Sequence, residues 1–200
     1  MKEVIRIVTE LKYGNTNTFF VQGTKGGLLV DTDYAGTMSA FYRAIKENNI
    51  KISSISYVLA THYHPDHMGL ISELMGLGVK LLLIDVQCPH VHFSDYIFDR
   101  DKRPDYEPIN EDDAAIVSVE ESRGFLKSIG IDGEIISSAS HSEDSVSLIL
   151  DSGVCIVGDL EPAEYLAAYD ENVRLREDWE RVMSYTPKII YYAHANKKIL

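Results

Sequence analysis

The stretch that decides the fold is Thr61-His62-Tyr63-His64-Pro65-Asp66-His67, which follows the apolar, strand-like run 55–60. Side chains of a strand alternate between its two faces, so His62 and His64, two apart at the strand end, project to the same side. Pro65 ends the strand, and the turn brings the aspartate and the third histidine back toward the same space. Four buried donors without a metal or partner would be costly. The spacing therefore indicates two metal ions, each bound by a pair.

Three further polar residues stand at the tips of apolar, strand-like runs. His141 comes after the predicted strand 133–137, Asp159 follows the run 154–158, and His194 ends a run near the C-terminus. Open α/β sheets place their functional sites at the ends of strands. We therefore expect these three side chains to converge with the 61–67 cluster.

The remaining chain alternates strand-like and helix-like segments without an internal repeat or linker. A β-α-β passage over 55–84 favours a layered α/β fold, and the order of elements suggests two mixed sheets covered by helices in one domain, 1–200. Residues 85–113 carry charges, prolines and aromatics without a clear period and are predicted to be a lid, either irregular or partly helical. Strands are predicted at 4–12, 17–22, 27–31, 55–60, 79–84, 133–137, 145–150, 154–158 and 188–193, and helices at 36–48, 68–76, 119–129 and 171–185.

The composition is that of an ordinary globular protein, with 45% hydrophobic and 25% charged residues. Lys and Arg number 19 against 31 Asp and Glu, a net charge of −12, which argues against nucleic acid as a partner. No apolar run approaches the ~20 residues of a membrane span, and the N-terminus does not resemble a secretory signal. Two cysteines, Cys88 and Cys155, make no disulfide framework, so we expect a cytoplasmic protein without a membrane partner and a buried thiol at Cys155.

In this order, the residues resemble the metallo-β-lactamase superfamily over essentially the whole chain. The resemblance rests on the pattern His-x-His-x-Asp-His-x-x-Gly at 62–69, on the three later strand-tip residues and on Asp31, which ends an early strand. It implies a four-layer αββα sandwich of two mixed β-sheets flanked by helices, with the metals at one edge. It also implies that Asp31 supports the ligand loop from outside the coordination sphere. The implied ligands are His62, His64 and His141 for the first metal, Asp66, His67 and His194 for the second, and Asp159 as the bridge.

The chain departs from the family pattern in a few places. Ser140 and Ala193 stand where the family often has glycine before a metal histidine, which changes loop shape but removes no donor. Relatives with a redox-active pair of irons have Glu where this chain has His64. The nitrogen-rich donor set favours two zinc ions, with iron or manganese as alternatives.

On this basis we expect a hydrolase in which a hydroxide bridging the two metals attacks the carbonyl of a small ester, thioester or lactone. Asp66 would orient the nucleophile and pass a proton to the leaving group. Strand alternation puts Tyr192 on the same face as His194, which makes it the candidate phenol beside the developing oxyanion.

Three other functions stay open on the same ligand set. They are a di-iron oxidoreductase resembling a persulfide dioxygenase, a phosphodiesterase of a small nucleotide, and a metal-binding or sensing module without catalysis. The phosphodiesterase ranks lower because no basic cluster is placed to hold phosphate. The expected partner is a small-molecule substrate, and a homodimer stays open. Within the lid, His90 and His92 are expected to face solvent or to pack the segment.

Overall fold

Six strands form the first sheet of this chain, for which a computed structural model describes residues 7–103, 105–168 and 172–200. The first three strands pair antiparallel, and the pairs from β3 to β6 are parallel, so the sheet is mixed. The parallel part contains the predicted β-α-β passage. In spatial order the strands are β1 (Val8–Leu11), β2 (Thr18–Gln22), β3 (Gly27–Val30), β4 (Ile55–Leu59), β5 (Lys80–Ile84) and β6 (Ala115–Val117).

The second sheet is built from the C-terminal part of the chain and has five strands within the described residues. Its β9–β10 pair is parallel and its other pairs are antiparallel, so this sheet is also mixed. In spatial order the strands are β11 (Lys198–Ile199), β10 (Ile189–Tyr191), β9 (Val154–Ile156), β8 (Val146–Leu150) and β7 (Gly133–Ser137).

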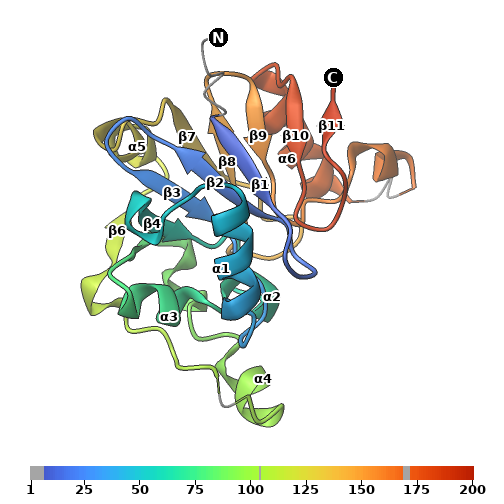
Figure 1. Ribbon diagram of the computed structural model, residues 1–200. Coiled ribbons are helices and arrows are strands. Elements are labelled where there is room, and N and C mark those ends of the chain that lie inside the picture. Colours follow the sequence, from blue (N-terminus) through green and yellow to red (C-terminus); the bar gives the residue numbers. More distant parts are fainter. Residues whose placement is uncertain (1–6, 104, 169–171) are drawn as a thin grey trace.

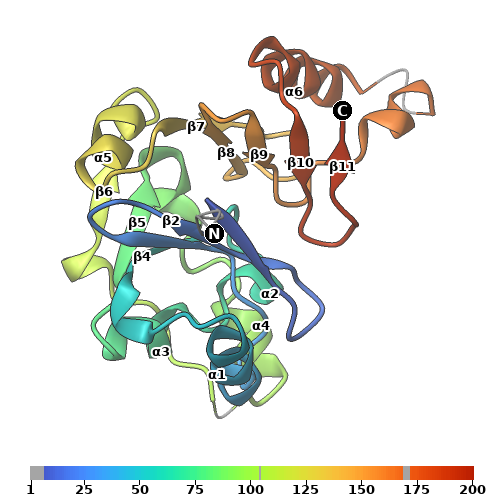
Figure 2. The same ribbon diagram turned by 45° about the horizontal axis from the view of Figure 1, so that its top comes forward.

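Helices cover the outer faces of both sheets. Figures 1 and 2 show α1 and α3 on the far side of the first sheet and α6 on the far side of the second. This arrangement confirms the predicted αββα sandwich. The helices are α1 (Met38–Glu47), α2 (Pro65–Met68), α3 (Ile71–Gly76), α4 (Asp95–Arg100), α5 (Ser122–Ser128) and α6 (Val173–Ser184).

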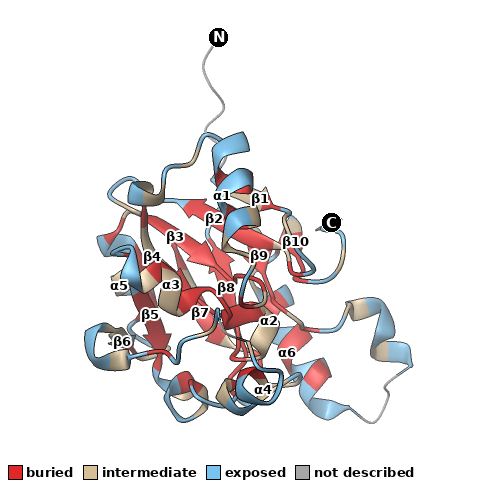
Figure 3. Cartoon of the chain, turned by 60° about the horizontal axis from the view of Figure 1, so that its bottom comes forward, coloured by how far each residue is buried: buried red, intermediate tan, exposed pale blue. Residues whose placement is uncertain are grey.

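Strand alternation explains the layers. On β8, Val146, Leu148 and Leu150 point into the core between the sheets, whereas Ile149 packs in the cluster that contains Trp179 of α6. Both faces of such a strand are buried, which is why it reads as an almost continuous apolar run. Figure 3 shows the buried strands at the centre and the helices with exposed outer sides.

Several element predictions need correction. The predicted helix 68–76 is two helices, α2 and α3, with a break between them. The short strands β6 and β11 were not expected. Of the two alternatives given for 85–113, the partly helical one is found, with α4 between two 3₁₀ turns, η2 (Asp85–His90) and η3 (Glu111–Asp113). Residues 4–6 of the first predicted strand, residue 104 of the lid and residue 171 of the last predicted helix lie outside the described residues.

Neither cysteine forms a disulfide, and Cys155 is buried as expected, whereas Cys88 is exposed. Among the helices of the described ranges, none combines the length and the apolar character that crossing a bilayer requires.

Candidate metal centre

Two buried carboxylates shape the loop that carries the first two histidines. Asp31 accepts hydrogen bonds from the backbone N–H of Thr61 at 2.6 Å and from its hydroxyl at 3.0 Å. Asp144 accepts one from the backbone N–H of Tyr63 at 2.6 Å. Because these carboxylates take N–H groups that a strand would give to its neighbour, β4 ends at Leu59. The prediction that the histidines continue the strand is therefore wrong, although their rings still meet.

The next two donors lie in a helical turn that Pro65 begins, at a position where its missing N–H costs nothing. His67 is fully buried, and its Nδ1 lies 3.2 Å from Asp31 Oδ2. The ring lies between two carboxylates, with 3.4 Å between Nε2 and Asp159 Oδ1 on its other side. The position of Asp31, outside the donor cluster and against a histidine, is the one that a supporting residue requires.

The other donors come from loops at the edge of the second sheet. The loop of His141 is held by Asp178 of α6, whose Oδ2 accepts a hydrogen bond from Ser140 N at 2.8 Å. Asp159 follows Gly158, whose φ of +57° favours glycine, and a Cβ there would stand 2.5 Å from Thr61 Oγ1. His194 lies beyond β10 in the described chain.

All seven predicted donors converge in one place. His62 Nε2 lies 2.8 Å from His64 Nδ1, and His141 Nε2 lies 3.2 Å from the same atom. On the other side, His194 Nε2 lies 3.1 Å from Asp66 Oδ2. Three groups of donor atoms, each within 4.8 Å of one another, could hold a metal ion: His62, His64 and His141; His62, His67 and Asp159; and Asp66, His67 and His194.

The carboxylate of Asp159 lies between the two sides of this cluster. Its Oδ2 is 3.9 Å from His62 Nε2 and 3.6 Å from His141 Nε2. Its Oδ1 is 3.4 Å from both His67 Nε2 and His194 Nε2. Tetrahedral ligands 2.0–2.1 Å from a zinc ion stand ~3.4 Å apart. One oxygen of Asp159 faces the histidines on each side of the cluster, at this spacing for Oδ1 and slightly farther for Oδ2.

The electrostatics of the cluster also fit a cation site. Burial, together with the neighbouring charges of His67 and His64, holds the pKa of His62 well below its usual value. Burial alone would lower the pKa of His67, but the charges of Asp31 and Asp159 outweigh it and raise the pKa to about 10. His67 Nε2 and Asp159 Oδ1 are buried, and neither has a hydrogen-bond partner in the part of the chain that the structure describes. Such atoms normally find partners, and a metal ion would satisfy both.

Asp66 lies at the solvent side of the second group, with a side chain that is 34% exposed. Burial raises its pKa, but the hydrogen bond from His194 and the charge of His67 outweigh this and lower the pKa to about 2. Thr16 Oγ1 lies 3.4 Å from Asp66 Oδ2. Asp66 is therefore an ionised acceptor at neutral pH.

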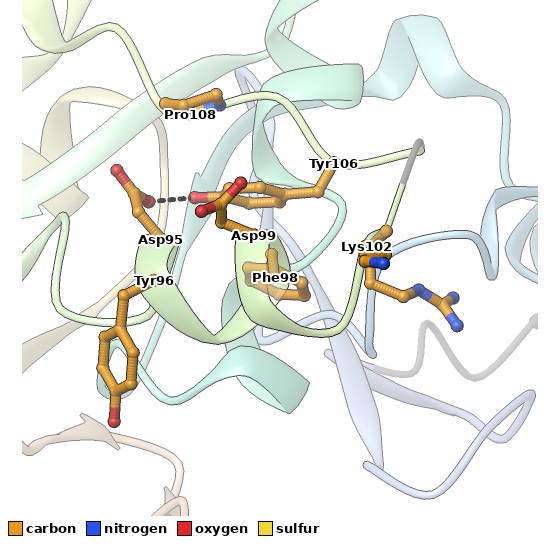
Figure 4. A pocket seen from close by; sticks show the side chains of 8 residues that line it. Asp95, Tyr96, Phe98, Asp99, Lys102, Tyr106 and Pro108 are labelled. Carbon is orange, nitrogen blue, oxygen red and sulfur yellow. Dashed lines mark hydrogen bonds between the residues drawn. The ribbon is translucent and has the colours of Figure 1, made fainter.

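Open space adjoins the centre. A pocket of about 360 Å³ is lined by His141, Asp159 and His194, together with Pro162 and Tyr165. A larger one, of about 590 Å³, lies elsewhere, beside α4 (Figure 4). The size of a pocket is therefore no guide to the site in this chain.

Tyr192, the candidate phenol, lines the pocket at the centre, but its ring packs with Trp179 under α6, with 6.4 Å between ring centroids. Its hydroxyl is buried and has no hydrogen-bond partner among the described residues. A role beside an oxyanion stays a prediction. In the lid, the His92 side chain is 51% exposed and also lies 2.8 Å from Asp95 and 3.1 Å from Glu111.

Three buried polar residues that support the ligand loops were not predicted from the sequence. Asp144 holds the backbone between His62 and His64, and Asp178 holds the His141 loop. Gln87 donates to the carbonyl oxygens of Ala60, Thr61 and Asp144, at 2.9, 3.3 and 3.2 Å. The only sequence signal for Asp144 is its place three residues after His141.

Among curated proteins, the chain is 23% identical over 200 residues to the "Beta-lactamase-like protein 2 homolog" of Drosophila melanogaster, covering 96% of this chain and 64% of that protein. It is also 32% identical over 76 residues to the "Putative diflavin flavoprotein A 2" of Synechocystis sp. (strain ATCC 27184 / PCC 6803 / Kazusa), covering 38% of this chain and 13% of that protein. The chain thus spans less than two thirds of the length of either relative.

Solved structures share the fold at low identity. The metallo-beta-lactamase family protein TTHA1429 from Thermus thermophilus aligns with a TM-score of 0.70 at 19% identity, over 96% of this chain and 73% of that one. TTHA1623 in a di-iron-bound form gives 0.70 at 17%, over 97% and 94% of the two chains. The family model described as the metallo-beta-lactamase superfamily matches residues 11–194. With its fold, its converging donors and this match, the chain belongs to the metallo-beta-lactamase superfamily.

Proposed function

We propose that this chain is a binuclear metal-dependent hydrolase of a small ester, thioester or lactone. The observation that carries the proposal is Asp159, whose two oxygens face separate sets of histidines at 3.4–3.9 Å. Such a carboxylate between two nitrogen-rich sets is suited to bridge two divalent cations, and the histidines favour zinc over magnesium or calcium.

The proposed ligands are His62, His64 and His141 on one side and Asp66, His67 and His194 on the other. When bound, divalent ions supply Lewis acidity and lower the pKa of coordinated water. The part of Asp66 is to accept a hydrogen bond from the attacking water, orient it, and pass a proton to the leaving group. Its partial exposure at the solvent side of the centre suits that role.

The substrate proposal rests on charge and on the lining of the pocket. Among the described residues, those that line the space beside His141 and His194 include several apolar side chains but neither Lys nor Arg, which suits carboxyl substrates better than phosphodiesters. A net charge of −12 also disfavours nucleic acid as a partner. Two free cysteines support a cytoplasmic location as part of the proposal.

The decisive experiment combines elemental analysis with a panel of esters, thioesters and lactones. We expect two metal ions per chain and, for Asp66→Ala at saturating zinc, a loss in kcat/KM of about 100-fold or more. Asp113→Ala, at an exposed aspartate of η3, is the matched control and should leave kcat/KM unchanged. Full activity of folded, zinc-loaded Asp66→Ala would refute the proposed role of Asp66.

A di-iron oxidoreductase is the second candidate, favoured by the similarity of the fold to TTHA1623 in its di-iron-bound form. The nitrogen donor of His64 argues for zinc instead. Iron in the protein as isolated, together with oxygen uptake in the presence of a reductant, would replace the hydrolase proposal.

A further inference from the structure

Two large aromatic side chains of the lid stay exposed, and one of them, Phe93, adjoins His64 of the metal centre. Phe93 is 52% exposed and Tyr96 is 60% exposed. The Phe93 ring lies 6.2 Å from the His64 ring, and the Tyr96 ring lies 6.3 Å from Phe93 at an interplanar angle of 88°. A single exposed aromatic is ordinary, but an adjoining pair beside a cluster of metal-binding side chains marks a contact surface.

The lid backbone around these rings is tied to the ligand loop. Ser94, between the two aromatics, is buried, and its hydroxyl donates to the carbonyl oxygen of Tyr63 at 2.5 Å. Tyr63 itself stands between His62 and His64. The pair is therefore positioned relative to the centre by the same loop that presents the histidines.

Contacts within the lid hold the pair from the other side. Tyr106 donates a hydrogen bond to Asp95, drawn as a dashed line in Figure 4, and His92 lies between Asp95 and Glu111. In the same view, Tyr96 extends from α4 away from Tyr106. Apart from its contact with Phe93, the Tyr96 ring is therefore exposed on the surface of α4.

We propose that Phe93 and Tyr96 form an aromatic wall that binds an uncharged aromatic ring in the acyl part of the substrate. The wall meets the centre at His64, so a ring that packs on Phe93 would belong to the part of the substrate next to the carboxyl group held there. Edge-to-face and offset contacts between aromatic rings are favourable. Asp95 stands directly before Tyr96 on α4 (Figure 4), which disfavours an anionic substituent. This inference rests on the proposed function.

Binding of carboxylate products tests the wall without turnover. In zinc-loaded protein, titration calorimetry should give phenylacetate an affinity about tenfold higher than acetate, as one well-packed ring pair allows. Phe93→Ala and Tyr96→Ala should each reduce this ratio at unchanged zinc content, and Phe93→Leu, which keeps an apolar side chain, should reduce it as well. Tyr42→Ala, at a 41% exposed tyrosine on α1, is the control and should keep the ratio.

Turnover separates the wall from the hydrolase proposal. The ratio of kcat/KM for phenylacetate esters over acetate esters should fall in the two wall variants. If the wild type hydrolyses neither ester but the variants lose the preference for phenylacetate over acetate, the aromatic wall is supported and the hydrolase proposal is refuted. If it hydrolyses both and the variants leave every ratio unchanged, the wall is refuted alone. Variants that change only self-association in sedimentation would instead make the pair a protein contact, which also overturns the proposal.

Discussion

Replacing Asp144 with alanine should loosen the loop that presents His62 and His64. The buried Tyr63 N–H would lose its carboxylate acceptor at 2.6 Å, and a hydrogen bond to a charged group contributes ~1.5–3 kcal/mol. Ser142 would lose less, because its hydroxyl also lies 2.7 Å from Ser145 Oγ. We therefore expect Asp144→Ala to lower the free energy of unfolding by ~2–3 kcal/mol.

The same change should weaken metal binding, since removal of such supporting contacts costs ~10–100-fold in affinity. Asp144→Asn is the matched variant: its amide oxygen still accepts from Tyr63, so its stability loss should be about 1 kcal/mol. Urea unfolding of the metal-free protein and zinc titration against a competing chelator measure the two effects. Equal unfolding midpoints and equal zinc affinities for Asp144→Ala and the wild type would show that Asp144 does not hold the loop.

Three further outcomes follow from single contacts. Gly14→Ala should lower the free energy of unfolding in urea by ~1–3 kcal/mol, because its Cβ would stand 1.1 Å from Asp33 Oδ2. It should also weaken zinc binding by disturbing Asn15, whose carbonyl oxygen lies 3.2 Å from His194 Nδ1. Gly124→Ala is the control and should not destabilise the protein, because no atom lies within 4 Å of the new Cβ. The hydrogen bond with Asp95 raises the pKa of His92, so protonated His92 stabilises the fold fully below the unfolded pKa of ~6.5 and loses this effect as the pH rises through the raised folded pKa. The difference in urea midpoint between wild type and His92→Asn should therefore narrow from pH 5.5 to 8.5. A difference that widens would contradict this prediction. Adding zinc at ~1,000 times its Kd to metal-free protein should stabilise it by ~4 kcal/mol in thermal unfolding, whereas an unchanged Tm would argue against a metal site.

The donor residues could be predicted because short stretches of the sequence are enough to indicate them. The 62–67 cluster needs no knowledge of the fold, and the tips at His141, Asp159 and His194 follow apolar runs that mark their strands. The layers could be predicted for the same reason, since long buried strands such as β8 leave a clear apolar signal.

The supporting contacts of Asp144 and Asp178, unlike those of Asp31, could not be predicted because they depend on pairings across the chain. Asp144 and Tyr63 are 81 residues apart, and Asp178 and Ser140 are 38 apart. The sequence around Asp144 and Asp178 does not distinguish them from aspartates that are exposed to solvent. The strands β6 and β11, with three and two residues, are too short to show a period of two. The alternation of side chains along a strand could not place Tyr192 relative to His194, because β10 already ends at Tyr191 and His194 lies in a loop beyond it.

The first ligand set takes histidines from loops of both sheets, and this affects the entropy of the unfolded chain. His64 follows a strand of the first sheet and His141 follows one of the second, 77 residues later. One ion bound to both would act as a removable cross-link, and closing a loop of this length reduces the entropy of the unfolded chain by an equivalent of about 4.5 kcal/mol. Bound metal would then add to the apolar packing that already holds the two sheets together.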